Sequence, residues 1–302
     1  MQNQEQNNND YSAPLVKQLN ELSDEPPVAA HQPTPDNPPW NSWAALGVWV
    51  ASIAFIVVLS NIFLLPYLLK QKLDFTNQNA LYEFAKNDPT AILLQVVATI
   101  PAHLLTLLLA WLVVTRLRKF SFRKTLGWSQ GGFLWWHYLV VLLGIFAVSL
   151  AVSRLVPEGD NEMLRIIHSS QAAVLVVAFL ATFTAPIVEE VVYRGILYSA
   201  FQRSFGVAPA VLVVTAVFAS VHFVQYWGSP ATIFLICFLS LILTSVRVFS
   251  KNLLPCIILH TAINGIQSIG LILQSFSQND SSTSAATAST TEKLAALVHL
   301  IK

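Results

Sequence analysis

The segment "PIVEEVVYRGILY", residues 186–198, is apolar except for three ionisable side chains: Glu189, Glu190 and Arg194. Ionisable side chains are costly inside a membrane helix and usually have a function there. The alternative interpretation is that the apolar span ends near Val188, so that the charges lie in the lipid headgroup layer, where charge costs little. Whether this segment lies inside the membrane or in the headgroup layer therefore decides whether its charges have a chemical function or only a structural role.

The composition indicates a membrane protein. Of the 302 residues, 54 % are hydrophobic and only 11 % are charged, and the mean hydropathy is +0.57. Soluble domains carry about twice that share of charged residues. The net charge of +1 and the lack of a basic stripe with interleaved aromatics exclude a nucleic-acid partner. Cys237 and Cys256 lie in apolar runs without a CxxC spacing, which predicts no chemistry for them.

Seven stretches are long and apolar enough, or nearly so, to cross a membrane, which needs about 20 mostly apolar residues. The sequence therefore predicts an all-α, polytopic membrane helix bundle with about seven transmembrane helices, and it leaves an eighth open. The predicted spans are 44–69, 91–114, 133–153, 172–202, 208–226, 231–249 and 253–275.

Three regions follow from this pattern. Residues 1–42 are polar and rich in Asn, Gln and Pro, which predicts a disordered tail. Residues 43–275 form the predicted transmembrane domain, with no cleaved targeting peptide before it. Residues 276–302 are predicted to be a polar tail, because they are rich in Ser, Thr and Ala and end in "TEKLAALVHLIK", whose apolar spacing suits a short amphipathic surface helix.

The loop after the second span is strongly basic, which predicts that it lies in the cytoplasm. Alternation of the spans then places Arg203, Arg247 and the amino terminus on the same side. The expected location is the cell membrane, as a multi-pass protein, and the compact plan favours a bacterial inner membrane. The basic residues of the loop are Arg116, Arg118, Lys119, Arg123 and Lys124.

Within the charged segment, the spacing predicts which glutamate is paired. Glu190 and Arg194 are separated by four residues, so they meet on one face of an α-helix. Glu189 is five residues from Arg194 and turns away from it. Arg194 is therefore expected to neutralise Glu190, which leaves Glu189 free for chemistry.

His222 lies at the same predicted depth as Glu189. Counted from the turn at Gly206, Glu189 lies 17 residues before it (206 − 189) and His222 lies 16 residues after it (222 − 206). At a rise of about 1.5 Å per residue, both side chains are about 25 Å from that turn. In an antiparallel helix pair they are expected to be level.

Two further polar residues, His260 and Asn264, are spaced i, i+4 on one face of the seventh span. They can face the same cavity if the helices tilt. By contrast, His103 and His137 stand alone in apolar stretches and are interpreted as ordinary core histidines.

A carboxylate, two histidines and an asparagine at one level suit peptide hydrolysis. This reaction needs a base that takes a proton from water, and donors that stabilise the oxyanion. Glu189 and His222 would activate the water, while His260 and Asn264 would donate to the oxyanion. No GxSxG elbow or Cys/His pairing indicates a covalent nucleophile.

Three motifs, EExxxR, FxxxH and HxxxN, occur in this order as "EEVVYR" (189–194), "FASVH" (218–222) and "HTAIN" (260–264). This set resembles the CAAX-processing endopeptidase and bacteriocin-immunity family of intramembrane glutamic proteases. The resemblance covers about residues 172–275. Many relatives have a further helix where this chain has its polar tail.

The resemblance implies a metal-free mechanism in a membrane endopeptidase whose substrate is a membrane-associated peptide or protein. It does not identify that substrate. It implies that Glu189 and His222 activate water, that His260 and Asn264 form the oxyanion hole, and that Glu190 and Arg194 support the site.

Two alternatives stay open. One glutamate and two histidines form a common catalytic zinc set, so Glu189, His222 and His260 are alternative metal ligands, although the HExxH spacing is absent. The second alternative is a non-catalytic immunity or scaffold protein that keeps the architecture of a protease.

Overall fold

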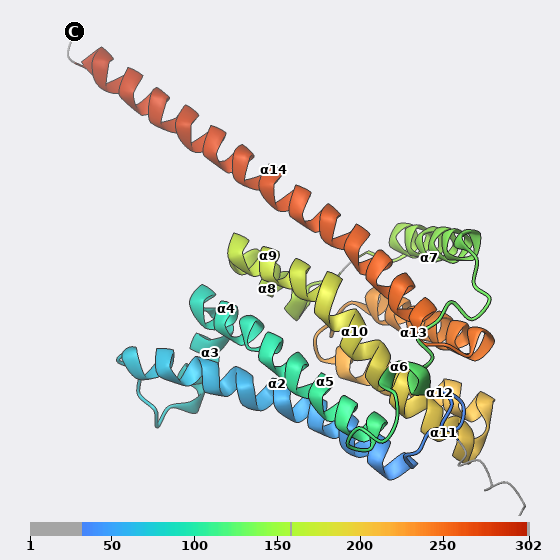
Figure 1. Cartoon of the computed structure of the whole chain (residues 1–302). Helices are drawn as coiled ribbons and strands as arrows, with labels where there is room; N and C mark the ends of the chain where they lie inside the picture. Colours follow the sequence, from blue (N-terminus) through green and yellow to red (C-terminus); the bar gives the residue numbers. More distant parts are fainter. Residues whose placement is uncertain (1–31, 158, 301–302) are drawn as a thin grey trace, which may run out of the picture. The chain divides into compact units, whose positions relative to one another are not determined.

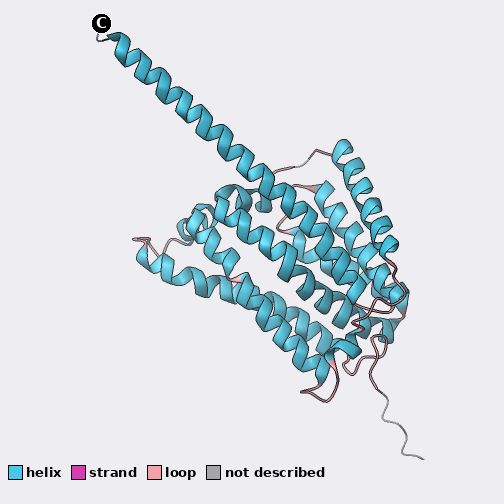
Figure 2. Ribbon diagram, turned by 45° about the horizontal axis from the view of Figure 1, so that its top comes forward, coloured by secondary structure: helices cyan, strands magenta, loops and turns pink. Residues whose placement is uncertain are grey.

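The computed structural model describes residues 32–157 and 159–300, which are helical apart from their loops and one isolated bridge between Thr34 and Asn37. The predicted all-α bundle is therefore confirmed (Figures 1 and 2). The first helices are α2 (Ser42–Lys70), α3 (Gln78–Asn87), α4 (Pro89–Val97), α5 (Thr99–Thr115), α6 (Phe122–Leu126), α7 (Trp135–Leu155) and α8 (Glu162–Ser169).

The second half of the bundle begins with the helix that carries the charged segment. This helix is made of α9 (Gln171–Phe179), η1 (Leu180–Thr184), α10 (Ala185–Glu189), η2 (Glu190–Leu197) and α11 (Tyr198–Phe205), where η1 and η2 are π-helical. It is followed by α12 (Val207–Phe223), α13 (Pro230–Ser250) and α14 (Leu254–Leu300).

Side-chain caps set the starts of several helices. Asn41 accepts a hydrogen bond from the Ala44 amide at the start of α2, and Asp88 does the same for α4, where Pro89 occupies the first helical position. Ser170 caps α9. These short polar residues satisfy amide groups that the first helical turn leaves without partners.

Within residues 32–157 and 159–300, six helices are long and apolar enough to cross a membrane. They correspond to the predicted spans except the fifth, which is α12, an apolar helix of only 17 residues. The six candidates are Ser42–Lys70, Pro89–Thr115, Trp135–Leu155, Gln171–Phe205, Pro230–Ser250 and Leu254–Ser277.

The charged segment forms the centre of the bundle. Helix η2 packs against α2, α5, α12 and α14, and all residues from 190 to 201 are buried. Figure 1 shows α2 and α5 running side by side next to this helix. A helix that is mostly apolar around its whole circumference is expected to be enclosed by other helices, which explains this position.

Residues 34–40, here called the strap, differ from the predicted disordered tail. Trp40 is 5 % exposed, and its indole N–H donates to the Ile196 carbonyl of η2 at 3.0 Å. Asp36 forms an ion pair with Arg247 at 3.0 Å. The prolines of the strap restrict its backbone, which lowers the entropy lost when it packs. The rest of the predicted tail, residues 1–31, lies outside the described residues.

The strap also tests the predicted grouping of basic residues. Arg116, Arg203 and Arg247, which the sequence places on one side of the membrane, all donate to backbone carbonyls of the strap. These three residues therefore lie at one end of the bundle. That this end is cytoplasmic remains a prediction.

The carboxyl-terminal region also differs from the predicted polar tail with a separate short helix. Helix α14 runs without interruption from Leu254 to Leu300. The sequence after Gly270 contains no glycine or proline, so it has no strong helix breaker.

Candidate active site

The helix that carries the glutamates is widened at two places. In η1, the Ala185 amide donates to the Leu180 carbonyl, five residues earlier. Pro186 explains this irregularity, because proline has no N–H group and its ring collides with the preceding turn of a regular α-helix. Such π-helical turns occur frequently at functional sites.

The predicted pair of Glu190 and Arg194 is confirmed. Arg194 Nη1 lies 2.8 Å from Glu190 Oε1, and both side chains are 0 % exposed. The other guanidinium nitrogens donate to Ser240 and Thr244 of α13, and the guanidinium lies 4.6 Å from the centre of the Phe218 ring. The pair is thus enclosed by protein. Its depth relative to the lipid headgroups remains a prediction.

His260 connects the two glutamates. Its Nδ1 lies 2.8 Å from Glu190 Oε1, and its Nε2 lies 3.7 Å from Glu189 Oε2. Because an ionised carboxylate only accepts hydrogen bonds, Nδ1 carries a hydrogen. Since Arg194 balances the charge of Glu190, a protonated His260 would balance the charge of Glu189.

Glu189 is the more accessible of the two carboxylates. Its side chain is 22 % exposed, whereas that of Glu190 is completely buried. The separation of 3.7 Å from His260 is too long for a strong hydrogen bond. As the spacing predicted, the arginine pairs with Glu190 and not with Glu189.

His222 lies near this cluster but does not contact Glu189 directly: in the part of the chain that the structure describes, no hydrogen bond or ion pair joins them. His222 Nδ1 lies 2.9 Å from the Phe218 carbonyl oxygen. A carbonyl can only accept, so Nδ1 carries the hydrogen and Nε2 of the neutral ring has a free lone pair. The Phe218 ring lies near both histidines: its centre is 4.8 Å from that of His222 and 6.3 Å from that of His260.

Asn264 has a structural partner that the sequence did not predict. Its Nδ2 donates to the Ala181 carbonyl at 3.0 Å. In the π-helical register, this carbonyl would accept from the residue at position 186, and Pro186 has no N–H group. The Asn264 amide replaces that missing donor, and its second N–H remains for another acceptor.

Two side chains near Glu189 were missed by the sequence analysis. His103 of α5 is 7 % exposed, and its Nδ1 lies 2.8 Å from the Thr184 hydroxyl. It also interacts electrostatically with Glu189. The Tyr193 hydroxyl, which accepts from the Trp49 indole at 3.1 Å, shares this electrostatic contact with Glu189. Tyr193 stands four residues after Glu189, the same spacing that pairs Glu190 with Arg194, so the sequence carried a signal for it. His103 lies on a different helix, and no spacing along the chain connects it to the glutamates.

The second histidine assigned to the core, His137, has a different position. It is half-buried at the start of α7, where its Nδ1 accepts from the Leu134 amide at 2.8 Å. His137 is thus a helix cap and takes no part in the cluster.

A metal site is not preassembled in the described parts of the chain. They contain no group of three or more His, Cys, Asp or Glu side chains that could hold a metal ion. In the candidate zinc set, His260 is bound to Glu190 through Nδ1, which leaves Nε2 as its possible ligand atom. The zinc alternative therefore stays a question for experiment.

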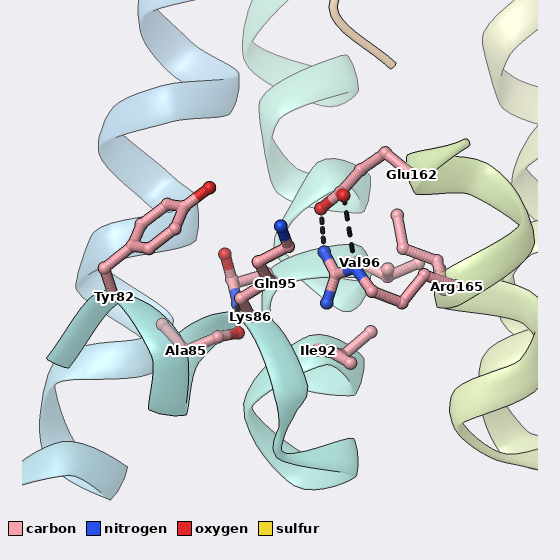
Figure 3. A pocket seen from close by; sticks show the side chains of 9 residues that line it. Tyr82, Ala85, Lys86, Ile92, Gln95, Val96, Glu162 and Arg165 are labelled. Atoms are coloured by element: carbon pink, nitrogen blue, oxygen red, sulfur yellow. Dashed lines mark hydrogen bonds and ion pairs between the residues drawn. The ribbon is translucent and has the colours of Figure 1, made fainter. Parts of the chain in front are cut away.

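A cavity of about 170 Å³ lies away from the glutamates, between α3, α4 and α8. Figure 3 shows Arg165 and Glu162 paired at its wall, with Lys86 and Gln95 beside them. It contains none of the predicted site residues. The cavity is therefore distinct from the candidate active site.

Comparison with known proteins agrees with the motif pattern. Residues 171–266 match the family described as type II CAAX prenyl endopeptidase Rce1-like. This range contains all three motifs. No curated protein and no solved structure matches the chain. The part of the chain that carries the candidate active site, residues 171–266, is therefore similar to the CAAX prenyl endopeptidase family.

Proposed function

We propose that this chain is an intramembrane glutamic endopeptidase, which hydrolyses a peptide bond of a membrane-associated protein. The proposal rests on two adjacent glutamates that differ in burial and in charge pairing. Glu190 is buried and neutralised by Arg194, whereas Glu189 is partly open and lies 3.7 Å from His260. One carboxylate is thus structural and the other is available as a base.

In the proposed first step, Glu189 takes a proton from a water molecule as the water oxygen attacks the peptide carbonyl. His222 orients this water through the lone pair of Nε2. The bond from His222 Nδ1 to the Phe218 carbonyl supports this role, because it fixes the ring and leaves Nε2 as the acceptor.

The oxyanion that forms needs hydrogen-bond donors placed in advance. His260 can provide one through Nε2–H only as an imidazolium, because its Nδ1–H is used by Glu190. Asn264 provides the second through the N–H that Ala181 leaves free. When the intermediate breaks down, the proton held by Glu189 passes to the leaving amine and the carboxylate is regenerated.

Glu190 and Arg194 support the site without contacting the substrate. Glu190 holds the His260 ring in place, and Arg194 compensates the buried negative charge. Arg194 is itself fixed by Ser240 and Thr244 of α13. These contacts connect three helices around His260, so the donor position is held rigidly.

The expected partners are the lipid bilayer and a membrane-associated peptide or protein. Six apolar helices and the family match make the chain a multi-pass membrane protein. A bacterial inner membrane is our proposed location. The residues around Glu189 contain nothing that identifies a prenylated cysteine as the substrate.

Replacing Asn264 by alanine should lower turnover by about 100-fold or more, the usual effect of removing one oxyanion donor. It should also destabilise the fold by about 1 kcal/mol, because the partly buried Ala181 carbonyl loses the side-chain donor that Asn264 provides. Cleavage of a membrane-tethered reporter peptide by purified protein in liposomes gives the rate, and thermal unfolding gives the stability.

The matched control is Asn61→Ala on α2, where the asparagine amide also donates to a backbone carbonyl, that of Val57. This variant should cleave normally. A normal rate for Asn264→Ala would remove Asn264 from the oxyanion hole and leave it only its structural bond.

The zinc alternative predicts the opposite response to chelation. Under the glutamate mechanism, the purified protein should contain no stoichiometric zinc and should keep its activity in EDTA or phenanthroline. Metal content by mass spectrometry and reporter cleavage measure both quantities. Activity that is lost on chelation and restored by zinc would instead assign Glu189, His222 and His260 as metal ligands.

A further inference from the structure

His103 is a buried histidine that the proposed chemistry does not use. It lies on α5, far from the three motifs in sequence, yet α5 packs against both η1 and α10. Its side chain is 7 % exposed and its Nδ1 lies 2.8 Å from the Thr184 hydroxyl. Burying a polar imidazole ring in an apolar span costs free energy, so its presence there indicates a function.

Its partner Thr184 is the last residue of η1, the π-helical turn before Glu189. The turn exists because Pro186 cannot continue a regular helix. Two side chains from other helices hold it: Asn264 of α14 binds the Ala181 carbonyl, and His103 binds Thr184. The turn is thus fixed from two sides.

The position of this turn sets the direction of Glu189. Helix α10 consists of five residues, Ala185–Glu189, and begins where η1 ends. Moving the end of the π-helical turn by one residue would rotate everything after it by about 100°. Glu189 would then no longer point toward His260.

We propose that His103 is a positioning residue for Glu189, acting through its hydrogen bond to Thr184. This inference rests on the proposed function, since it assigns the role of His103 relative to the base. Helix α5, which carries His103, packs against α10, which ends at Glu189.

The hydrogen-bond directions indicate which substitution preserves this contact. The Thr184 hydroxyl donates to the Leu180 carbonyl at 3.4 Å, so it accepts from His103 Nδ1–H. An asparagine amide occupies nearly the same place as Nδ1 of histidine. His103→Asn should therefore keep the bond, and His103→Phe should lose it while filling similar space.

In the liposome assay, His103→Phe should lower kcat roughly 10- to 100-fold, because displacing a base by about 1 Å has effects of this size. KM should be unchanged, because His103 does not touch the substrate. His103→Asn should recover most of the rate. Thr184→Val should match His103→Phe, and the double variant should be no worse than either single one. His137→Phe is the control and should be normal.

An independent measurement separates this inference from the protease proposal. In a Cys237→Ala background, where Cys256 is fully buried, a cysteine introduced by Glu189→Cys is labelled with a soluble maleimide in membrane vesicles. His103→Phe should change the labelling rate several-fold and His103→Asn should not.

If the wild type cleaves nothing but labelling responds in this way, the protease proposal fails and the positioning role stands. If Glu189→Gln abolishes cleavage while neither His103→Phe nor Thr184→Val changes kcat or labelling, the positioning role is refuted. Should His103→Phe fail to fold, Thr184→Val and His103→Asn give the same test.

Discussion

Replacing Glu189 by glutamine should reduce cleavage of a membrane-tethered reporter peptide by about 10²–10⁴-fold, the contribution of a positioned general base. Glutamine has nearly the same shape but cannot accept the proton from water. Because Glu189 is partly exposed and makes only a 3.7 Å contact with His260, its neutral replacement should leave the fold intact. The rate is measured in liposomes, and thermal unfolding in detergent reports on stability.

Glu83→Gln is the matched control for this change. Glu83 is an exposed carboxylate on α3 that accepts a hydrogen bond from Asn87, so its loss should affect neither rate nor stability. Wild-type cleavage by Glu189→Gln would refute the glutamate mechanism. A wild-type protein that protects cells from a toxin but cleaves no peptide would instead favour the immunity or scaffold alternative.

Part of the site was predictable because it depends on residues that are close together in the sequence. The spacing of Glu190 and Arg194 along one helix is enough to predict their pairing, which the structure confirms at 2.8 Å. Likewise, long apolar stretches are sufficient to predict spanning helices. The meeting of His260 with the glutamates is a longer-range contact, and it was predictable only from the assumption that the helices start from the same side.

What could not be predicted depends on backbone irregularity and on contacts between distant segments. The regular α-helix assumed for the span 172–202 contains no π-helical turn, so the bond between the Ala181 carbonyl and Asn264 could not be expected. The role of His103 depends on how α5 packs, which one sequence does not reveal. For the strap, composition favoured disorder, whereas the burial of Trp40 and the ion pair of Asp36 favour order.

Replacing Arg194 by leucine should destabilise the protein by about 3–5 kcal/mol, the cost of leaving one member of a buried ion pair without its partner. Arg194 and Glu190 are 0 % exposed, so water cannot solvate the remaining carboxylate. Ser240 would also lose the guanidinium that donates to it. We therefore expect low folding yield and a lower Tm, together with reduced cleavage, because the Glu190 carboxylate that binds His260 loses the arginine that fixes it.

The double variant Glu190→Leu, Arg194→Leu tests the physical cause. If the unpaired charge is responsible, removing both partners should recover much of the stability, since apolar side chains can replace a buried pair. Cleavage should not recover, because the double variant also removes the carboxylate that orients the His260 ring. The control is Arg154→Leu, which removes an exposed charge from the last turn of α7 and should leave Tm unchanged. Wild-type yield and Tm in Arg194→Leu would show instead that the pair does not lie in a closed, water-free interior.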